Sequence, residues 1–453
     1  MKISVFGLGK VGLTLSACLS SAGNEVIGVD LDRDLVEALM RGSFHTCEPG
    51  LLDRLAQAAP CHFAATTDAA RAIRETDLSF VIVPTPSNVL GGFSLRYVLA
   101  VCGEIGALLK TKSGDHTVAV VSTMLPGSSE LRVIPCLEKA SGRKVGDGLG
   151  YAYNPSFIAL GEIVAGIEHP DYLLIGETGT CSGDLILSAH RTIVRHTAPI
   201  ARMTPVEAEI TKIASNTHET MRVSFANMLL SACSEVPGAN VDRITEALAH
   251  RMGRRFFKGA VPYGGPCWPR DNKALAAFME AIHTPSRLPR AVDLFNDDHG
   301  QYLLRKILSI AKVGERVGIL GLAYKPGTPS IDRSFGVDLA TWLVKEGRPV
   351  IGWDPLALSE TRNLMGDRIG YASSPQDCMK RSDVVVIVNP LREVKEIDWP
   401  AFAGTTVIDC WRCLPPASAA QLRHYIPLGQ GPVRDFTGWA SQTVGEYFDL
   451  LTD

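Results

Sequence analysis

The chain begins with Ile3-Ser4-Val5-Phe6-Gly7-Leu8-Gly9-Lys10-Val11-Gly12, in which a short apolar run leads directly into a glycine-rich turn. The apolar run predicts a buried β-strand, and a segment of helical character follows the turn. In such a unit Gly7 permits the tight turn, Gly9 lets a pyrophosphate approach the backbone, and Gly12 lets helix and strand pack closely. The stretch therefore predicts the strand, turn and helix that open a dinucleotide-binding α/β domain, with the helix N-terminus facing the phosphates.

The next predicted strand ends at Asp30, eighteen positions after Gly12. A carboxylate at this place accepts hydrogen bonds from a ribose diol and repels a 2′-phosphate, which favours NAD over NADP. Arg33 is a counter-argument, because its guanidinium could pair with that phosphate. The alternative interpretation is a glycine-rich turn of an α/β fold that binds no nucleotide.

Short apolar runs alternate with helical stretches from residue 1 to about residue 200, which argues for a parallel sheet covered by helices. Strands are expected at Ile3–Phe6, Val26–Val29, Ser79–Val83, Thr117–Val121 and Tyr172–Ile175. Between Pro205 and Val236 apolar residues recur at helical spacing, which predicts one long helix.

Strand-like runs return after Gly314, at Val317–Leu320, Val350–Trp353, Val384–Val388 and Val407–Ile408. We therefore expect an α/β protein with two Rossmann-like, doubly wound parallel-sheet domains, joined by a central helical region that contains the long helix. The expected domains are residues 1–202, 203–312 and 313–453.

The composition is that of a soluble globular chain: of 453 residues, 46% are hydrophobic and 21% charged, with a net charge of -3. This balance implies no polyanion-binding surface, so no nucleic acid partner is expected. No apolar run approaches the length of a membrane span, and the apolar N-terminal run is interpreted as a strand and not as a secretion signal. Eleven scattered cysteines fit a reducing cytoplasm better than a disulfide framework. The single Cys-x-x-Cys, at Cys410 and Cys413, lacks a second pair at zinc-site spacing, so no metal is expected.

The segment Tyr263-Gly264-Gly265-Pro266-Cys267-Trp268-Pro269-Arg270-Asp271 carries the strongest chemical signal. Its two glycines bring the backbone close to another group, and Pro269 is expected to open a helix, since proline suits the first helical position. A cysteine just before a helix N-terminus, with Arg270 nearby, lies in a positive field that favours the thiolate. A lone cysteine is usually inert, but this surrounding sequence reverses that expectation. Together with a dinucleotide site, an activated thiol indicates an oxidation in which an aldehyde is captured covalently.

Three further polar residues are candidates for this site. Lys212 and Asn216 are four apart on the long helix and share a face, although a solvated pair is the default interpretation. Asp271 lies four positions after Cys267, and its simpler role is to complement the helix dipole. A second glycine turn, Gly318 to Lys325, lacks the third glycine of the first, so it indicates either a different nucleotide or a purely structural domain.

At these motifs the chain resembles the nucleotide-sugar 6-dehydrogenases, a family that includes UDP-glucose, GDP-mannose and UDP-N-acetylhexosamine dehydrogenases. The resemblance covers nearly the whole length in order, through Gly7–Gly12, Glu48–Leu51, Val83–Ser87, Ser122–Gly127, Asn154-Pro155, Glu209–Asn216, Gly264–Asp271 and Gly321–Lys325. The match to Gly-Gly-x-Cys-x-Pro-[Lys/Arg]-Asp is highly specific. It implies that the first domain binds NAD, the central region carries a dimer interface, and the last domain binds the sugar nucleotide.

The resemblance also implies a four-electron oxidation of a sugar C6 alcohol to a uronic acid, through a thiohemiacetal and a thioester on Cys267. Lys212 and Asn216 would stabilise the oxyanion, Asp271 would handle protons, and Thr123 would position water or nicotinamide. The implied cofactor-binding residues are Gly7, Gly9, Val11, Gly12, Asp30, Arg33, Thr85 and Thr123. The implied substrate-binding residues are Lys212, Asn216, Gly264, Gly265, Lys325 and Arg251, the last of which could act from another subunit.

Two departures from the family pattern keep alternatives open. Ser156 and Leu160 replace glutamates of the run that follows Asn-Pro, and the first of those glutamates assists the water chemistry in the family. A two-electron variant, or a catalytically impaired relative that only binds a sugar nucleotide, is therefore an alternative. UDP-glucose is the expected substrate, with GDP-mannose or a UDP-N-acetylhexosamine as alternatives. A cytoplasmic homodimer or higher homo-oligomer is expected, acting in polysaccharide biosynthesis.

Overall fold

The computed structural model describes residues 1–58 and 62–432. They form two compact units: Met1–Ser215 with Lys273–Ser286, and Asn216–Asn272 with the residues from Arg287 onward. The fold class expected from the sequence is confirmed, because each unit is built on a largely parallel sheet with helices packed against it.

The described part of the first unit contains a nine-stranded sheet in the order β3-β2-β1-β4-β5-β7-β8-β9, with β6 beside β7. Only the β7–β8 pair is antiparallel among these neighbours. The strands are β1 Lys2–Phe6, β2 Glu25–Val29, β3 Phe63–Thr66, β4 Leu78–Val81, β5 His116–Val120, β6 Lys144–Val145, β7 Gly148–Tyr153, β8 Leu173–Glu177 and β9 Ile200–Met203. The helices are α1 Lys10–Ser21, α2 Arg33–Arg41, α3 Leu51–Gln57, α4 Ala69–Glu75, α5 Arg96–Leu109, α6 Ile134–Ser141, α7 Ile163–Glu168 and α8 Thr180–Ile193, with a π-helical turn at Ser129–Val133.

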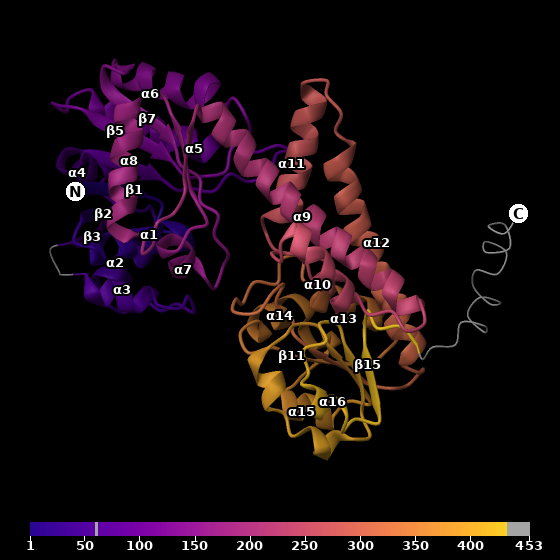
Figure 1. Ribbon diagram of the computed structural model, residues 1–453. Helices are drawn as coiled ribbons and strands as arrows, with labels where there is room; N and C mark the ends of the chain where they lie inside the picture. The colour runs from indigo at the N-terminus through magenta and orange to yellow at the C-terminus, as the bar shows by residue number, and fades with distance from the viewer. Residues whose placement is uncertain (59–61, 433–453) are drawn as a thin grey trace, which may run out of the picture. The chain divides into compact units, whose positions relative to one another are not determined.

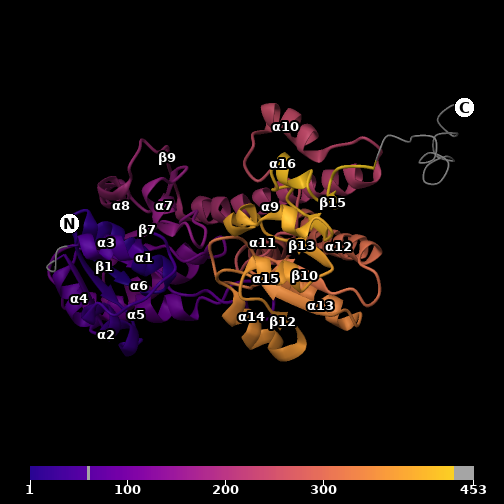
Figure 2. The ribbon, with the colours of Figure 1, turned by 90° about the horizontal axis from the view of Figure 1, so that it is seen from below.

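Alternate residues of the strands feed two apolar cores, one on each face of this sheet. Ile3 and Val5 pack with residues of α1, α7 and α8, whereas Phe6 packs with residues of α4, α5 and α6. Figure 2 shows the first group of helices on one side of β1 and the second group on the other. Covered on both faces, the central strands are buried and mainly apolar, which is why they could be recognised in the sequence.

The second unit carries an all-parallel six-stranded sheet within its described residues, in the order β12-β11-β10-β13-β14-β15. Its strands are β10 Val317–Leu320, β11 Val350–Trp353, β12 Gly370–Tyr371, β13 Val384–Ile387, β14 Thr406–Asp409 and β15 His424–Pro427. Its sheet-covering helices are α13 Phe335–Lys345, α14 Leu358–Met365, α15 Pro375–Lys380 and α16 Pro416–Ala419.

The helices of the middle of the chain are α9 Pro205–Glu235, α10 Val241–Met252, α11 Trp268–Ala281 and α12 Arg287–Ile310. Figure 1 shows α9 as one continuous long helix, as the sequence predicted. Leu303 and Ile307 of α12 share one core with Val317 and Ile319 of β10. The compact units therefore divide the expected central region, and most of it packs with the C-terminal sheet.

All nine strands expected from the sequence are present, and each end agrees within two residues. The strands that were not expected are short or lack a continuous apolar run: β3, β6, β7, β9, β12 and β15. Within the described residues, no helix combines the length and apolarity that crossing a bilayer requires.

Candidate active site

The first glycine turn has the shape that a dinucleotide needs. Gly7 has a φ of +95°, and a Cβ placed on it would lie 2.2 Å from the carbonyl oxygen of Ile82. A Cβ on Gly12 would lie 1.8 Å from the carbonyl oxygen of Gly7, so both positions require glycine for packing. Gly9 caps α1, and a Cβ on it would meet nothing within 4 Å. Only Gly9 therefore faces open space, where the backbone can approach a phosphate, and the turn fits a dinucleotide.

Asp30 lies beside this turn at the end of β2. One carboxylate oxygen accepts a hydrogen bond from the backbone N–H of Leu8 at 2.6 Å, and the other accepts one from Asp32 N–H at 3.0 Å. Each oxygen retains a lone pair for a ribose hydroxyl. Arg33 is exposed at the start of α2, whose first turn is capped by the Asp32 side chain.

Thr85 and Thr123, from the loops after β4 and β5, are brought together. The Thr85 hydroxyl donates to the Thr123 carbonyl oxygen at 2.8 Å. Beside it, the Ser122 hydroxyl donates to Val83 O at 2.7 Å and accepts from Val83 N at 3.0 Å. These bonds join two loops at the carboxyl edge of the sheet, where open α/β sheets bind ligands.

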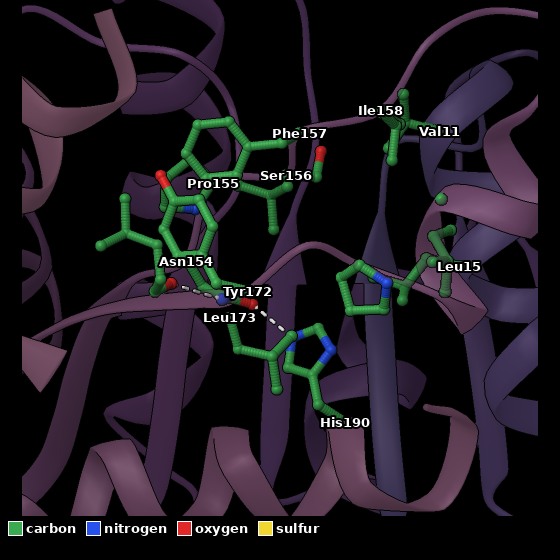
Figure 3. A pocket seen from close by; sticks show the side chains of 15 residues that line it. Val11, Leu15, Asn154, Pro155, Ser156, Phe157, Ile158, Tyr172, Leu173 and His190 are labelled. Carbon is green, nitrogen blue, oxygen red and sulfur yellow. Dashed lines mark hydrogen bonds between the residues drawn. The ribbon is translucent and has the colours of Figure 1, made fainter. Parts of the chain in front are cut away.

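The loop after β7 lines a small cavity of about 50 Å³ together with the start of α1 (Figure 3). Val11 and Ser156, both singled out from the sequence, lie on this cavity. His190 also lines it, and its Nε2 is 2.7 Å from Asn154 Oδ1. Burial lowers the pKa of His190 to about 4, so the imidazole is neutral at neutral pH.

Lys212 lies on α9 and is only 8% exposed, so its interpretation as a solvated side chain is wrong. Its ammonium group donates to the backbone oxygen of Ser156 at 2.8 Å and lies 4.5 Å from the centre of the Phe157 ring. The contact to Ser156 uses the main chain, so it does not depend on the side chain at that position.

The rest of this loop is held by Glu48. Its carboxylate accepts hydrogen bonds from Gly161 N at 2.9 Å and Ile163 N at 2.6 Å, at the start of α7. Leu160 packs against the apolar core of this face, where the family run has a glutamate. The motif that contains Glu48 was recognised in the sequence, but no role was assigned to its carboxylate.

Glu209 is a second carboxylate without a role in the sequence analysis. It is fully buried on α9, and its oxygens accept from Gly127 N, Ser129 N and the Ser129 hydroxyl at 2.6, 2.9 and 2.7 Å. Burial raises the pKa of Glu209 to about 7, and these donors oppose the rise.

In the second unit, Cys267 immediately precedes α11, as predicted. Its carbonyl oxygen accepts the first helical hydrogen bond, from Asp271 N at 2.8 Å, and the residue is exposed. Pro269 is the second residue of the helix. The thiol side chain therefore stems from the positive end of α11, where a thiolate is stabilised.

Asp271 and Asn216 are buried and hydrogen bonded to each other. Asn216 Nδ2 donates to Asp271 Oδ2 at 2.6 Å, and Arg270 Nε donates to Oδ1 at 2.9 Å. One residue further along each helix, the Thr217 hydroxyl donates to Asn272 Oδ1 at 2.8 Å. These pairs join α9 to α11 directly beside Cys267. They show that Asp271 has specific partners besides the helix dipole.

Gly264 and Gly265 approach the loop that follows β10. A Cβ on Gly264 would lie 2.1 Å from Arg333 O, and one on Gly265 would lie 2.7 Å from the ring of Tyr324. Gly265 N also donates to Asp332 O at 2.8 Å. The glycines thus bring the Cys267 segment against the loop that contains Lys325.

The second glycine turn does possess a third glycine, which the sequence analysis missed. A Cβ on Gly336 would lie 2.1 Å from Gly321 O, the same relationship as between Gly12 and Gly7. The signal is hidden because a long loop separates strand from helix.

Asp354, after β11, differs from Asp30 because four backbone N–H groups occupy its oxygens, from Leu322, Ala323, Leu356 and Ala357. Since a carboxylate has about four lone-pair sites, no acceptor remains here for a ribose.

Two other candidates lie elsewhere in the second unit. Arg251 is exposed at the end of α10 and, within the described residues, joins none of these hydrogen-bonded groups.

Burial raises the thiol pKa of Cys410 and brings that of Cys413 to about 12. Both thiols therefore stay protonated at neutral pH, which disfavours metal or redox chemistry at this pair.

Three consecutive parts of the chain match domains of the UDP-glucose/GDP-mannose dehydrogenase family: its NAD binding domain over residues 1–194, its central domain over 206–298 and its UDP binding domain over 318–416. The chain is 32% identical over 410 residues to the UDP-glucose 6-dehydrogenase AglM of Haloferax volcanii, which covers 89% of this chain and 93% of that one. It is 32% identical over 424 residues to the GDP-mannose 6-dehydrogenase of Pseudomonas putida, covering 90% and 95%.

Among solved structures, the chain is similar to a UDP-glucose dehydrogenase from the hyperthermophilic archaeon Pyrobaculum islandicum. The TM-score is 0.85 at 30% identity, over 94% of this chain and 97% of that one.

Proposed function

The chain belongs to the UDP-glucose/GDP-mannose dehydrogenase family, and from this premise we propose that it oxidises UDP-glucose to the corresponding uronic acid in two steps. The family match and the similar enzymes identify the general activity, which is that of an NAD-dependent nucleotide-sugar 6-dehydrogenase. The proposed two-step oxidation rests mainly on the position of Cys267, which lies directly before α11 and beside the buried Asn216–Asp271 pair.

The cysteine is needed because an alcohol reaches a carboxylate only through an aldehyde. In the first step the C6 alcohol loses a hydride and a proton. The Cys267 thiolate then adds to the aldehyde carbon, and the resulting thiohemiacetal loses a second hydride and becomes a thioester. Water cleaves the carbon–sulfur bond and releases the carboxylate. The sum consumes one alcohol, two NAD⁺ and one water, and yields one carboxylate, two NADH and three protons.

The remaining residues would act on charge and protons at the same carbon. Lys212 and Asn216, one turn apart on α9, are proposed to stabilise the oxyanion of the tetrahedral intermediates. Asp271 is proposed to move protons to or from that oxygen or the attacking water, and its bond from Asn216 supports a fixed orientation. Thr123 is proposed to position water or the nicotinamide, and its bond from Thr85 supports this.

NAD, when bound, supplies the hydride acceptor for both oxidations. The residues proposed to hold it are the glycine turn with Val11, then Asp30 and Arg33 near the ribose, and Thr85 with Thr123 near the nicotinamide. The open space at Gly9 supports this assignment, as does the free acceptor capacity of Asp30.

The nucleotide sugar is proposed to meet Lys325 and Arg251, along with Lys212, Asn216 and the backbone at Gly264 and Gly265. The close packing of Gly265 on Tyr324 supports a shared site, because it brings the loop of Lys325 against the Cys267 segment. The similarity to the two UDP-glucose dehydrogenases above supports UDP-glucose, and the equal identity to a GDP-mannose 6-dehydrogenase makes GDP-mannose the first alternative.

A two-electron variant is the second candidate, because Ser156 stands where the family has a glutamate. The presence of Cys267 and the burial of Lys212, Asn216 and Asp271 argue against a silent sugar-nucleotide-binding relative, since a silent protein has no need of them. We also propose a cytoplasmic homodimer or higher homo-oligomer that supplies uronic acid for polysaccharide synthesis. Exposed apolar residues on α9, Phe225 and Met228, support an assembly surface there.

The test is to mix the purified protein with NAD and a panel of UDP-glucose, GDP-mannose and UDP-N-acetylhexosamines, and to count NADH formed per sugar consumed. Two NADH per UDP-glucose, with the uronic acid as product, is the expected result. One NADH with free aldehyde would replace the proposal with the two-electron variant. No turnover of any sugar, despite binding, would favour the silent relative.

A further inference from the structure

Glu209 presents an unusual arrangement in the first unit: a glutamate with no exposed surface, on the second turn of a helix that carries Lys212. Removing a carboxylate from water costs several kcal/mol unless hydrogen bonds replace the lost water. Glu209 and Lys212 are three residues apart and therefore lie on neighbouring positions of one helical face. A buried acid at this place is thus close to a residue that the reaction needs.

The partners of Glu209 all come from one short segment. Oε2 accepts from the backbone N–H of Gly127 at 2.6 Å, and Oε1 accepts from both the N–H and the hydroxyl of Ser129, at 2.9 and 2.7 Å. The Ser129 hydroxyl also lies 2.7 Å from the hydroxyl of Tyr151 on β7. One carboxylate therefore attaches α9 to the segment that begins with Ser122 and Thr123.

The other end of this segment is attached independently. Thr85 bonds the carbonyl of Thr123, and Ser122 bonds the main chain at Val83. Thr123 therefore lies between two attachments, one to the loop after β4 and one to α9. Among the groups that form these hydrogen bonds, the carboxylate of Glu209 is the charged one.

We infer that Glu209 is a positioning residue, which holds the Thr123 segment to α9 so that Thr123 and Lys212 keep a constant separation during both oxidation steps. The inference rests on the proposed function, in which those two residues act on the same reacting carbon. A displacement of about 1 Å in such a site can cost about 100-fold in rate.

The arrangement explains why glutamine is a poor substitute. A carboxylate accepts with both oxygens, whereas an amide has one acceptor and one donor. In Glu209→Gln, the amide NH₂ must face either Gly127 N–H or the two donors of Ser129. One donor group is left without a partner, and the attachment is weakened while the volume of the side chain is retained.

The pH behaviour provides a second line of support. Burial, with a smaller contribution from the nearby charge of Glu130, raises the pKa of Glu209 to about 7, whereas the hydrogen bonds from Ser129 and Gly127 lower it. Protonation converts one oxygen into a donor, so it weakens the attachment in the same way as the amide does. The wild-type kcat should therefore rise as the pH increases through about 7, and this rise should be missing in Glu209→Gln.

The experiment compares full-length wild type, Glu209→Gln and a matched control, Glu207→Gln. Glu207 is exposed on the same helix, and its carboxylate accepts hydrogen bonds from the N–H and the hydroxyl of Thr204. For Glu209→Gln we expect amide exchange in the segment 122–131 to be faster by about 10-fold or more, with β10 unchanged as an internal reference. We expect kcat with UDP-glucose to fall about 10- to 100-fold, with KM changed by less than about threefold. Glu207→Gln should match the wild type.

If Glu209→Gln lowers the melting temperature but leaves kcat unchanged, Glu209 is purely structural and the inference is overturned. Unchanged amide exchange in the segment 122–131 of this variant would also overturn it. If Glu209→Gln fails to fold, Ser129→Ala removes one of the three donors and should give a smaller loss of kcat in the same direction; an unchanged kcat in that variant would also overturn it. Wild-type protein that oxidises no sugar nucleotide would refute the proposed function, and the amide exchange would still report on the attachment.

Discussion

Asn216 on α9 donates a 2.6 Å hydrogen bond to the carboxylate of Asp271 in the first turn of α11. Both side chains are nearly inaccessible, at 6% and 1% exposure. Their contact joins two helices at the point where Cys267 ends its loop. It therefore ties the orientation of a proposed proton carrier to the helix that carries a proposed oxyanion donor.

Asn216→Asp should disrupt this contact with almost no change in shape. Two buried carboxylates cannot share a site without repulsion, so one must take up a proton or move away. We expect kcat to fall by about 100-fold or more, and unfolding free energy to fall by about 1–3 kcal/mol. Asn240→Asp is the control, since Asn240 caps α10 and aspartate caps equally well. Steady-state kinetics and urea titrations measure both; equal activity in the two variants would show that the contact is dispensable.

Cys267→Ser should remove carboxylate formation, because an ester on serine is released far less readily than a thioester. UDP-glucose binding, followed by calorimetry, should persist. Cys181→Ser is the control, since Cys181 is also exposed but lies on α8. Uronic acid formation at the wild-type rate in Cys267→Ser would mean that the thiol is not the nucleophile.

Asp30→Ala should reduce the preference for NAD, since the carboxylate that repels a 2′-phosphate is lost. The variant also loses the acceptor of Leu8 N–H, so KM for NAD should rise, by about 10-fold or more. Asp32→Asn removes a nearby charge but retains the cap of α2, and it should preserve the preference. The ratio of kcat/KM for NAD and NADP decides the matter. Comparable kcat/KM values for NAD and NADP in the wild type would instead indicate that Arg33 binds the 2′-phosphate.

Ser156→Glu should accelerate the steady state if hydrolysis of the thioester limits the wild type. A lost general acid–base contact costs about 10²–10⁴-fold, so acyl-enzyme on Cys267 should accumulate during turnover. The substitution keeps the main-chain oxygen that Lys212 uses. Intact-mass analysis of quenched enzyme detects the adduct, and Ser188→Glu on the exposed face of α8 is the control. Absence of the adduct, with a neutral or harmful effect of Ser156→Glu, would show that another group such as Asp271 already activates the water.

His116 should make the first unit less stable in acid. Burial and the nearby charge of Lys112 lower its pKa to about 3, from the usual 6.5. Below pH 6.5 the unfolded chain therefore takes up a proton that the folded chain refuses, so stability present above pH 6.5 is lost as the pH falls towards 3. The loss is about 1.4 kcal/mol per pH unit. His116→Gln should remove that slope in urea titrations at pH 7, 6 and 5, whereas replacing the exposed His45 by Gln should not.

Local patterns in the sequence were sufficient for the main elements and for naming several candidate site residues. The glycine turn at Gly7–Gly12, the long helix α9 and the helix start after Cys267 depend on neighbours within a few positions, so periodicity and turn chemistry predict them. The short strands were not predicted, because they form through pairing with strands that are distant in the sequence. β7, with the sequence Gly-Leu-Gly-Tyr-Ala-Tyr, becomes a strand because β5 and β8 flank it.

The tertiary structure alone decided which polar groups meet. Asn216 and Asp271 are 55 positions apart, Glu209 and Ser129 are 80, and Glu48 and Gly161 are 113. It also revealed Gly336 as the partner of Gly321, and it showed that Lys212, for which a solvated position was the default interpretation, is buried. A charged side chain is buried only when distant donors or acceptors replace water, and no local pattern records those partners. The sequence by itself determined the apolar strands of both sheets, the long helix α9 and the choice of Cys267 as the candidate thiol. The packing of segments remote in the sequence determined which polar side chains are buried together, because those contacts depend on partners that no local pattern contains.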